Sequence, residues 1–311
     1  MAIGPIILTV LGLCLFEIVS SIDNAIINAE VLSTLRPRAR KWFLLWGLLF
    51  AVVLVRGLLP WLIVWFATPS LGPLGALTAA FSGDPKILGA VEASAPILLV
   101  GGGTFLVFLF FHWLFLEEKE YGIIGERFFH ANGVWFYAVI SFILSAIVWS
   151  SLRHSSMMAF GAVLGSTTFF VTHGLKQRAE EGERSLTNKE MSSFSKLLYL
   201  EIIDATFSVD GVLGAFAFTM SVPLILIGNG LGALVVRQLT MGNIDRIKRY
   251  VFLKNGAMYS ILFLGIVMLL DSFGHTLPNW MSPLITFVVV GFFLFKSVRA
   301  VPTPAPERNL S

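Results

Sequence analysis

The chain is poor in charge. Asp, Glu, Lys and Arg make up only 13% of its 311 residues, whereas a soluble domain has about 25%. Hydrophobic residues account for 56% of the sequence and the mean hydropathy is +0.81. This composition excludes a soluble globular domain and predicts an all-α integral membrane protein with several spans.

Cysteine and histidine are also scarce. The single cysteine, Cys14, lies in the first apolar segment, so one chain can form neither a disulfide framework nor a thiolate metal site. The five histidines are scattered, and only His112 and His173 fall in or at the ends of apolar segments. We interpret these two as helix-packing residues and find no zinc-type pair. Soluble catalytic motifs, phosphate loops and nucleic-acid modules are absent as well, so we expect neither an enzyme nor a nucleic-acid partner.

Apolar runs near the roughly 20 residues that cross a bilayer predict about nine transmembrane helices. They lie at about 5–30, 42–66, 94–116, 134–151, 155–173, 196–219, 222–236, 254–272 and 281–298. The fourth and fifth, split only by residues 151–154, and the short seventh are the weakest, and either could be a re-entrant piece. The apolar part of segment 67–93 is expected to lie in the interface or dip into the membrane.

The basic residues set the expected topology. If the connections alternate, all of the 22 Lys and Arg residues fall inside except Lys86, Arg153 and Arg56. The N-terminus is then outside and the C-terminus cytoplasmic, in the cell (inner) membrane. The expected organisation is an N-terminal half at 1–173, a cytoplasmic linker at 174–195, a C-terminal half at 196–299 and a disordered tail at 300–311.

Two acidic clusters interrupt membrane-length apolar segments. The first contains Glu17, Asp23 and Asn24, and the second contains Glu201, Asp204 and Asp210. A carboxylate at the bilayer centre costs about 2.5–3.5 kcal/mol on the insertion scale. Five of them therefore require compensating partners, and a cation is the simplest.

The clusters behave as two copies of one unit. Residues 21–25 (SIDNA) align with residues 208–212 (SVDGV), and residues 47–56, ending in Arg56, resemble residues 228–237, ending in Arg237. The charge bias predicts that the first segment crosses the membrane from outside to inside and the sixth from inside to outside. The two halves are therefore predicted to have inverted topology. We interpret Arg56 as a charge partner for the empty site and Arg237 as an interface anchor.

Helical geometry limits which groups can converge. At 100° per residue, Glu17, Ser21 and Asn24 share one face, and Glu201, Asp204 and Ser208 share another. Asp23 and Asp210 lie off those faces. Either the helices break near these aspartates or the aspartates face other neighbours.

The candidate donors are all oxygen atoms, which suit hard cations such as Mn²⁺, Ca²⁺ and Mg²⁺. The predicted metal-binding residues are Glu17, Asp23, Asn24, Glu201, Asp204 and Asp210. The plain alternative is a structural network that ties helices together. An intramembrane aspartyl protease would also need two membrane aspartates, but neither SSIDN nor FSVDG supplies its expected GxGD context.

The motifs resemble those of the TerC family of integral membrane proteins. EIVSSIDNA at 17–25 is similar to that family's E-x-x-x-S-x-D-N, and EIIDATFSVDGV at 201–212 is similar to E-x-x-D-x-x-F-x-x-D-S, with Gly211 at the usual serine. GGGTFLVF at 101–108 and GFFLFKSV at 291–298 resemble its glycine-rich spans. The resemblance implies a LysE-like inverted-repeat transporter fold, export of manganese or a related divalent cation, and a link to tellurite resistance.

The sequence thus predicts a divalent-cation exporter that works by alternating access, with protons as the exchanged ion and lipid as its surroundings. The alternative is a non-transporting assembly or stress-resistance partner of other membrane proteins.

Overall fold

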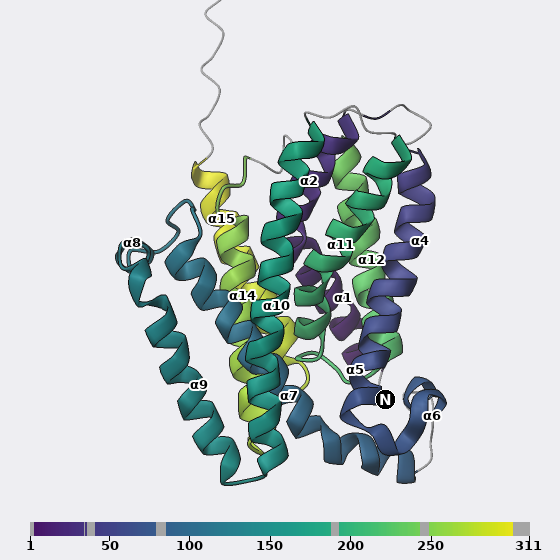
Figure 1. The fold of residues 1–311 in the computed structure, drawn as a ribbon, viewed down its shortest axis with the longest axis vertical. Helices are drawn as coiled ribbons and strands as arrows, with labels where there is room; N and C mark the ends of the chain where they lie inside the picture. The colour runs from purple at the N-terminus through teal and green to yellow at the C-terminus, as the bar shows by residue number, and fades with distance from the viewer. Residues whose placement is uncertain are drawn as a thin grey trace, which may run out of the picture.

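The computed structural model describes residues 3–33, 35, 41–78, 85–187, 193–242 and 249–300, and the regular structure in these ranges is entirely helical (Figure 1). The longer helices, in chain order, are α1 (Ile3–Ser20), α2 (Ile22–Ser33), α5 (Leu59–Ala67), α7 (Pro85–Leu116), α9 (Phe136–Leu152), α10 (Ser156–Thr187), α11 (Ser193–Ala215), α12 (Val222–Gly242), α14 (Leu253–Ser272) and α15 (Met281–Ala300). Shorter pieces are the π-helical turns η1 (Phe43–Gly47) and η2 (Ala51–Leu58), the helices α4 (Leu48–Phe50), α6 (Gly72–Thr78) and α8 (Glu126–Ala131), and the 3₁₀ turns η3 (Pro69–Leu71) and η4 (Gly133–Trp135).

Within the described ranges, seven helices are long and apolar enough to cross a membrane, or up to eight if a bent pair counts as one span. The chain is therefore an all-helical, multi-pass membrane protein. Helices occupy all nine predicted segments, but α11 carries four charged residues and does not qualify by composition. Nine spans and their orientation stay predictions. The fourth and fifth predicted spans are full-length helices, α9 and α10, and α12 is longer than the short seventh span predicted.

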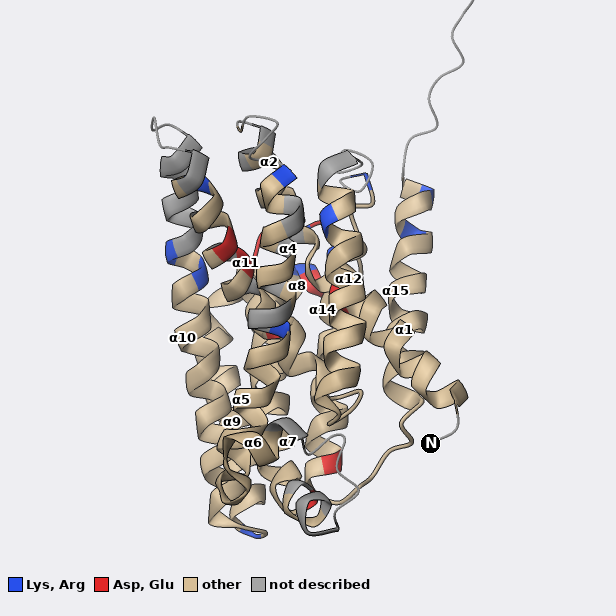
Figure 2. Cartoon of the chain, turned by 90° about the vertical axis from the view of Figure 1, so that its right-hand side faces the viewer, with Lys and Arg blue, Asp and Glu red and all other residues tan. Residues whose placement is uncertain are grey.

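The helix ends group at two poles of the bundle. The ends of α2, α10, α12 and α15 lie at the upper pole in Figure 1, and the α9–α10 turn and the start of α15 lie at the lower one. Figure 2 shows basic residues mainly toward the upper pole, with the lower half largely uncharged.

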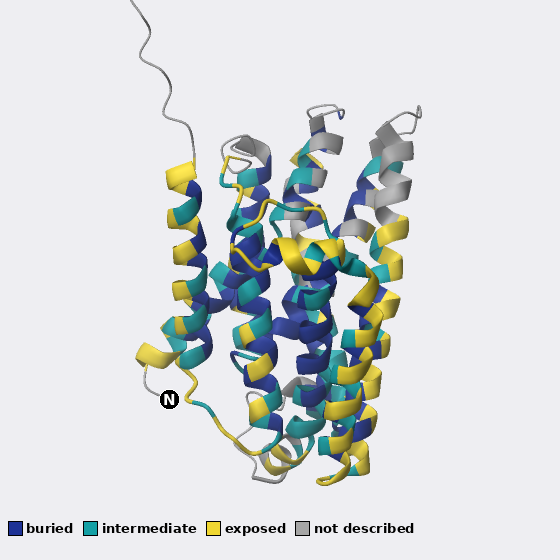
Figure 3. Cartoon of the chain, turned by 90° about the vertical axis from the view of Figure 1, so that its left-hand side faces the viewer, coloured by how far each residue is buried: buried dark blue, intermediate teal, exposed yellow. Residues whose placement is uncertain are grey.

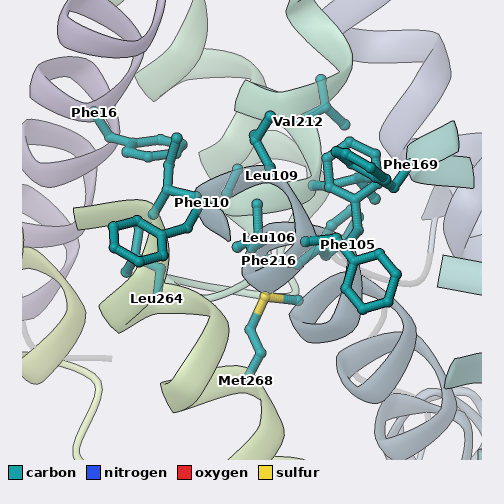
Figure 4. Packing of buried hydrophobic residues seen from close by; sticks show 14 of the residues in the cluster. Phe16, Phe105, Leu106, Leu109, Phe110, Phe169, Val212, Phe216, Leu264 and Met268 are labelled. Atoms are coloured by element: carbon teal, nitrogen blue, oxygen red, sulfur yellow. The ribbon is translucent and has the colours of Figure 1, made fainter. Parts of the chain in front are cut away.

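Helix α7 forms the centre of the apolar core. It packs against α10 on one side and α14 on the other. Figure 4 shows Phe105, Leu106 and Phe110 of α7 among side chains of the neighbouring helices, including Phe169 of α10 and Met268 of α14. Outward faces remain exposed, as Figure 3 shows, which is expected of helices that contact lipid.

Glycines allow α7 and α10 to approach at backbone distance. A Cβ atom at Gly165 would lie 2.0 Å from the carbonyl oxygen of Gly101, and one at Gly161 would lie 2.8 Å from that of Ile97. Small residues at such contacts are typical of membrane helix pairs, since packing replaces the hydrophobic effect there.

Two connections differ from the sequence expectation. The predicted linker, 174–195, is helical up to Thr187 as a continuation of α10, and α11 begins at Ser193. After α5 the chain turns by 102° and folds back through α6, where Trp61 Nε1 donates a hydrogen bond to the carbonyl of Pro73 at 2.8 Å. The loop predicted at 67–93 is thus shorter, because α7 already starts at Pro85. The predicted tail lies, beyond residue 300, outside the described residues.

Candidate functional site

The first acidic motif lies at a helix break. Helix α1 ends at Ser20 and α2 begins at Ile22, so the predicted interruption near SSIDN is present. Glu17 is buried, with 1% of its surface exposed, and accepts a hydrogen bond from Ser21 Oγ at 2.9 Å. Asn24 in α2 is also buried. Backbone bonds from Ser21 N to Glu17 O and from Ala25 N to Ser21 O keep the α-helical spacing across this junction, so Glu17 and Asn24 face the interior together, as their shared helical face predicts.

Arg56 pairs with Glu17. Its guanidinium donates from Nε to Glu17 Oε1 at 3.1 Å and from Nη2 to the same oxygen, and 2% of Arg56 is exposed. Arg56 lies in the π-helical turn η2. Such turns are uncommon and are often found at functional sites.

Glu201 and Arg237 form a second pair in the other half. Arg237 Nη2 lies 3.2 Å from Glu201 Oε2, and Arg237 Nη1 donates to the carbonyl of Phe43 at 2.7 Å. The guanidinium also stacks over the Phe43 ring, 4.0 Å from its centroid. The interpretation of Arg237 as an interface anchor is therefore wrong. Because α12 continues to Gly242, Arg237 lies more than a turn inside the helix instead of at its end.

Asp204 connects the two pairs. Its Oδ2 lies 3.4 Å from Arg237 Nη2 and 3.8 Å from Arg56 Nη1, while its Oδ1 accepts a hydrogen bond from Asn24 Nδ2 at 2.5 Å. We call Glu17, Asn24, Arg56, Glu201, Asp204 and Arg237 the acid–arginine centre. If all its groups are ionised, three carboxylates and two guanidinium groups leave one negative charge.

The centre repeats one arrangement in both halves of the chain. In each half an acid on one helix pairs with an arginine on the next membrane segment, Glu17 with Arg56 and Glu201 with Arg237. The halves also interlock, since α1 packs on α12 and α11 packs on η2. The match of Arg56 with Arg237 agrees with the repeat read from the sequence. The alignment of residues 21–25 with 208–212 places Glu17 opposite Asp204, however, whereas the structure gives Glu17 and Glu201 the same role.

Glycines bring the backbone against these carboxylates. A Cβ atom at Gly47 would lie 2.0 Å from Glu201 Oε1, one at Gly232 would lie 2.6 Å from Glu17 Cβ, and one at Gly211 would lie 2.8 Å from Glu17 Oε2. The centre is consequently enclosed tightly on several sides by helices of both halves.

Several oxygen acceptors in and beside the centre have no donor. Among the described residues, none donates a hydrogen bond to Glu17 Oε2, Asn24 Oδ1, Asn28 Oδ1 or Asn229 Oδ1, and all four atoms are buried. Asn229 and Glu17 both lie beside Gly211 of α11: the Asn229 amide donates to the Gly211 carbonyl at 3.4 Å, and a Cβ atom at Gly211 would lie 2.8 Å from Glu17 Oε2. Buried polar atoms normally have partners, so these oxygens are candidate cation ligands. Asn28 and Asn229 were not among the predicted ligands.

The structure divides the predicted ligand set. It brings Glu17, Asn24, Glu201 and Asp204 together, but Asp210 pairs with Lys176 of α10 instead. Helix α11 continues unbroken to Ala215, so Asp210 faces a different neighbour, one of the two outcomes expected from helical geometry. The side chain of Asp23 lies outside the described part of the structure. Ser208, which shares the face of Glu201 and Asp204, donates its hydroxyl hydrogen to the carbonyl of Asp204 at 2.6 Å.

No three His, Cys, Asp or Glu side chains in the described ranges are grouped so that they could hold a metal ion. The carboxylates of the centre are paired with guanidinium groups instead. A metal could reach these oxygens only after an arginine moved away.

A second polar cluster surrounds a cavity of about 580 Å³ on the other side of α11. The rings of His112 and His173 lie with centroids 4.0 Å apart, and His112 Nδ1 is 3.3 Å from Glu117 Oε1. Glu117 Oε2 in turn pairs with Lys254 at 2.8 Å. The two histidines are thus neighbours and not scattered, a contact between α7 and α10 that sequence reasoning missed.

Glu117 follows α7 directly and is held ionised. Partial burial opposes its charge, but the hydrogen bond with His112 and the ion pair with Lys254 outweigh burial and hold the pKa of Glu117 well below its usual range. A carboxyl with a lowered pKa stabilises the folded state above its unfolded pKa of 4.5, and that contribution is lost as the pH falls below this value.

We expect Glu117→Gln to reduce the acid sensitivity of the fold. Thermal unfolding of detergent-purified protein between pH 6 and pH 3.5, roughly the interval over which this carboxyl gains its proton in the unfolded state, should show a smaller loss of melting temperature in the variant than in the wild type. The exposed neighbour Glu118, changed to Gln, is the matched control. Equal acid sensitivity of wild type and Glu117→Gln would contradict the expectation.

The fold and the site define a multi-pass helical membrane protein with a buried acid–arginine centre between two halves. A family model described as "Protein of unknown function (DUF475)" matches residues 22–302, so the chain belongs to this family. No curated protein and no solved structure matches the chain. The resemblance to the TerC family stays a prediction from the motifs.

Proposed function

We propose that this protein is a transporter of a divalent cation, manganese being the first candidate, in the cytoplasmic membrane. It exports the cation by alternating access through the acid–arginine centre. The observation that carries the proposal is the set of buried oxygens without donors, Glu17 Oε2, Asn24 Oδ1 and Asn229 Oδ1, in a centre with an excess of carboxylate. Ionisable groups inside a membrane protein commonly mark an ion pathway.

The donor set defines the class of substrate. Carboxylate and amide oxygens are hard ligands, which suit Mn²⁺, Mg²⁺ and Ca²⁺ and disfavour soft metals. The described polar atoms of the centre include no thiolate or imidazole. The six residues of the centre come from both halves, so a movement of one half against the other would change which side can reach it.

The two arginines give this centre a defined empty state. When no cation is bound, Arg56 neutralises Glu17 and Arg237 neutralises Glu201, which keeps the buried carboxylates compensated. A divalent cation that enters would replace Arg56 at Glu17 and Asp204, where the Arg56–Asp204 contact is the longest at 3.8 Å. The guanidinium thus acts as a tethered competitor that returns when the cation leaves.

Asp204→Asn should abolish transport while it leaves the fold intact. The amide keeps the shape and can still accept from Asn24, but it removes the one carboxylate that faces both arginines. In proteoliposomes with an entrapped metal-sensitive dye, we expect manganese flux to fall at least about tenfold, since charged hydrogen bonds contribute about 1.5–3 kcal/mol. Manganese should also raise the melting temperature of the wild type and not that of the variant.

Asp271→Asn is the matched control, because it makes the same chemical change at the far end of α14. Mn²⁺, Ca²⁺ and Mg²⁺ are compared in parallel. A wild-type protein that carries none of these ions would overturn the proposal, and so would an Asp204→Asn variant with normal flux.

One observation favours the second candidate, a non-transporting partner that assembles or protects other membrane proteins. Glu17, Glu201 and Asp204 each have an arginine within 4 Å, as in a structural network. In that case manganese would give no stabilisation, and Asp204→Asn would change the proteins recovered with this chain instead of ion flux. A protease is not favoured, since neither SSIDN nor FSVDG supplies the GxGD context that such an enzyme needs.

A further inference from the structure

The cavity beside the acid–arginine centre contains two histidines that the cation site does not use. His112 of α7 is 8% exposed and its ring lies 4.0 Å, centroid to centroid, from that of His173 in α10. Phe136 and Phe169 pack against His112 on the side away from the cavity, and Phe169 stacks on His173. The pair therefore has apolar rings on one side and the cavity on the other.

The geometry of this pair favours the binding of one proton over the binding of two. The contact with Glu117 favours a hydrogen on Nδ1 of His112, which leaves the other ring nitrogen of His112 and the ring of His173 as acceptors. Two imidazolium rings at this separation would repel each other, so protonation of one ring disfavours protonation of the other.

Four of the five charged groups around the histidine pair form two ion pairs. The charged groups that face the pair across the cavity are Glu117 and Glu118 after α7, Lys176 of α10, Asp210 of α11 and Lys254 of α14. Lys176 pairs with Asp210, and Lys254 pairs with Glu117. Each imidazole ring has a nitrogen that can accept a proton while both ion pairs stay intact.

Helix α11 lies between the cavity and the acid–arginine centre, and two consecutive residues of this helix face the two sites. Asp210 faces the cavity, whereas its neighbour Gly211 would place a Cβ atom 2.8 Å from Glu17 Oε2. The cavity also reaches Ser20 and Ile22, the two residues that flank the break between α1 and α2. A change of α11 or of the break would therefore act on both sites.

We propose that the His112–His173 pair is the proton-binding site of this transporter, at which a counter-transported proton is held and released toward the cytoplasm as a cation is taken up at the acid–arginine centre. The inference rests on the proposed transport function and adds the identity and the place of the exchanged ion. It differs from the expectation that the clustered carboxylates themselves carry the protons.

The test uses proteoliposomes of the full chain with an imposed pH gradient and manganese at equal concentration on both sides. In the wild type the gradient should drive manganese accumulation. His112→Gln and His173→Gln should each reduce that accumulation at least about tenfold, the scale of one lost proton-transfer group, and flatten its pH profile. Exchange of labelled for unlabelled manganese, which needs no net proton movement, should continue. His275→Gln, an exposed histidine beyond α14, should behave as the wild type.

The outcomes separate the two proposals. Accumulation that persists in both variants overturns the proton site. Wild-type manganese exchange without any response to the pH gradient also overturns it, and leaves the transport proposal standing. A wild type with no manganese movement at all removes the transport proposal and the proton site with it.

If both variants lose labelled exchange as well, ¹⁵N NMR of the histidines in the wild-type protein decides. A single shared protonation of the pair supports the site, and two independent titrations overturn it.

Discussion

Arg56→Gln is expected to destabilise the protein by about 3–5 kcal/mol, the usual cost of leaving one partner of a buried ion pair without its charge. Glu17 is 1% exposed and its Oε1 accepts both guanidinium contacts from Arg56, so both contacts are buried away from solvent. The loss should appear as a much lower melting temperature and poor recovery in detergent. Arg153→Gln, at the exposed end of α9, is the matched control.

A double change separates the charge effect from the loss of packing. Glu17→Gln combined with Arg56→Gln removes both charges and keeps two polar side chains of similar size in contact, so most of the stability should return while manganese flux stays absent. If Arg56→Gln alone were as stable as the wild type, the buried charge of Glu17 would not need Arg56 as its counter-ion. That result would contradict the proposal that the Arg56 guanidinium competes with the cation.

Gly165→Ala should disrupt the contact between α7 and α10. The added Cβ atom would lie 2.0 Å from the carbonyl oxygen of Gly101 and 2.7 Å from its carbonyl carbon, and these are backbone atoms that cannot rotate away. We expect a loss at or above the upper end of the about 1–3 kcal/mol typical of overpacking. The unfolding midpoint in a denaturing detergent titration measures it.

Gly174→Ala provides the comparison within the same helix. Nothing lies within 4 Å of a Cβ atom there, so alanine should stabilise α10 by about 0.5–1 kcal/mol through its higher helix propensity. Equal behaviour of the two alanine variants would mean that α7 and α10 are not in backbone contact. Because His112 and His173 meet across this interface, Gly165→Ala should also change the titration of the histidine pair.

The sequence predicts the helical membrane class and the two acidic motifs well, because apolar length and intramembrane charge are local properties. It also predicts that Asp210 lies off the face of Asp204, since this follows from 100° per residue. The structure accordingly pairs Asp210 with Lys176 on a different side of α11. The partner itself could not be predicted, because Lys176 is 34 residues away along the chain and belongs to α10.

The roles of residues that are set by tertiary contacts are harder to predict from the sequence. The prediction that Arg237 is an interface anchor is wrong because it depends on where α12 ends. The length of α12 decides whether a basic residue lies at the end of the helix or inside it. The contact between His112 and His173 depends on the glycines that let α7 and α10 approach, and nothing in the spacing of two distant histidines indicates it. Asn229 carried a weak signal, since it stands eight positions before Arg237 in the repeat of the second half.

The π-helical turn around Arg56 makes the position of its guanidinium dependent on hydrogen-bond register. In η2 the backbone bonds run from each residue to the fifth one along, one residue further than in an α-helix. If the π-type bonds moved to the C-terminal side of Arg56, Arg56 would rotate by roughly 100°, the angle of one α-helical residue, and the residues from Leu59 on would keep their place. Such a slip would withdraw Arg56 from Glu17 with little displacement of α5 or of the turn held by Trp61. The counter-ion of Glu17 can thus be exchanged by a change confined to two turns of one helix.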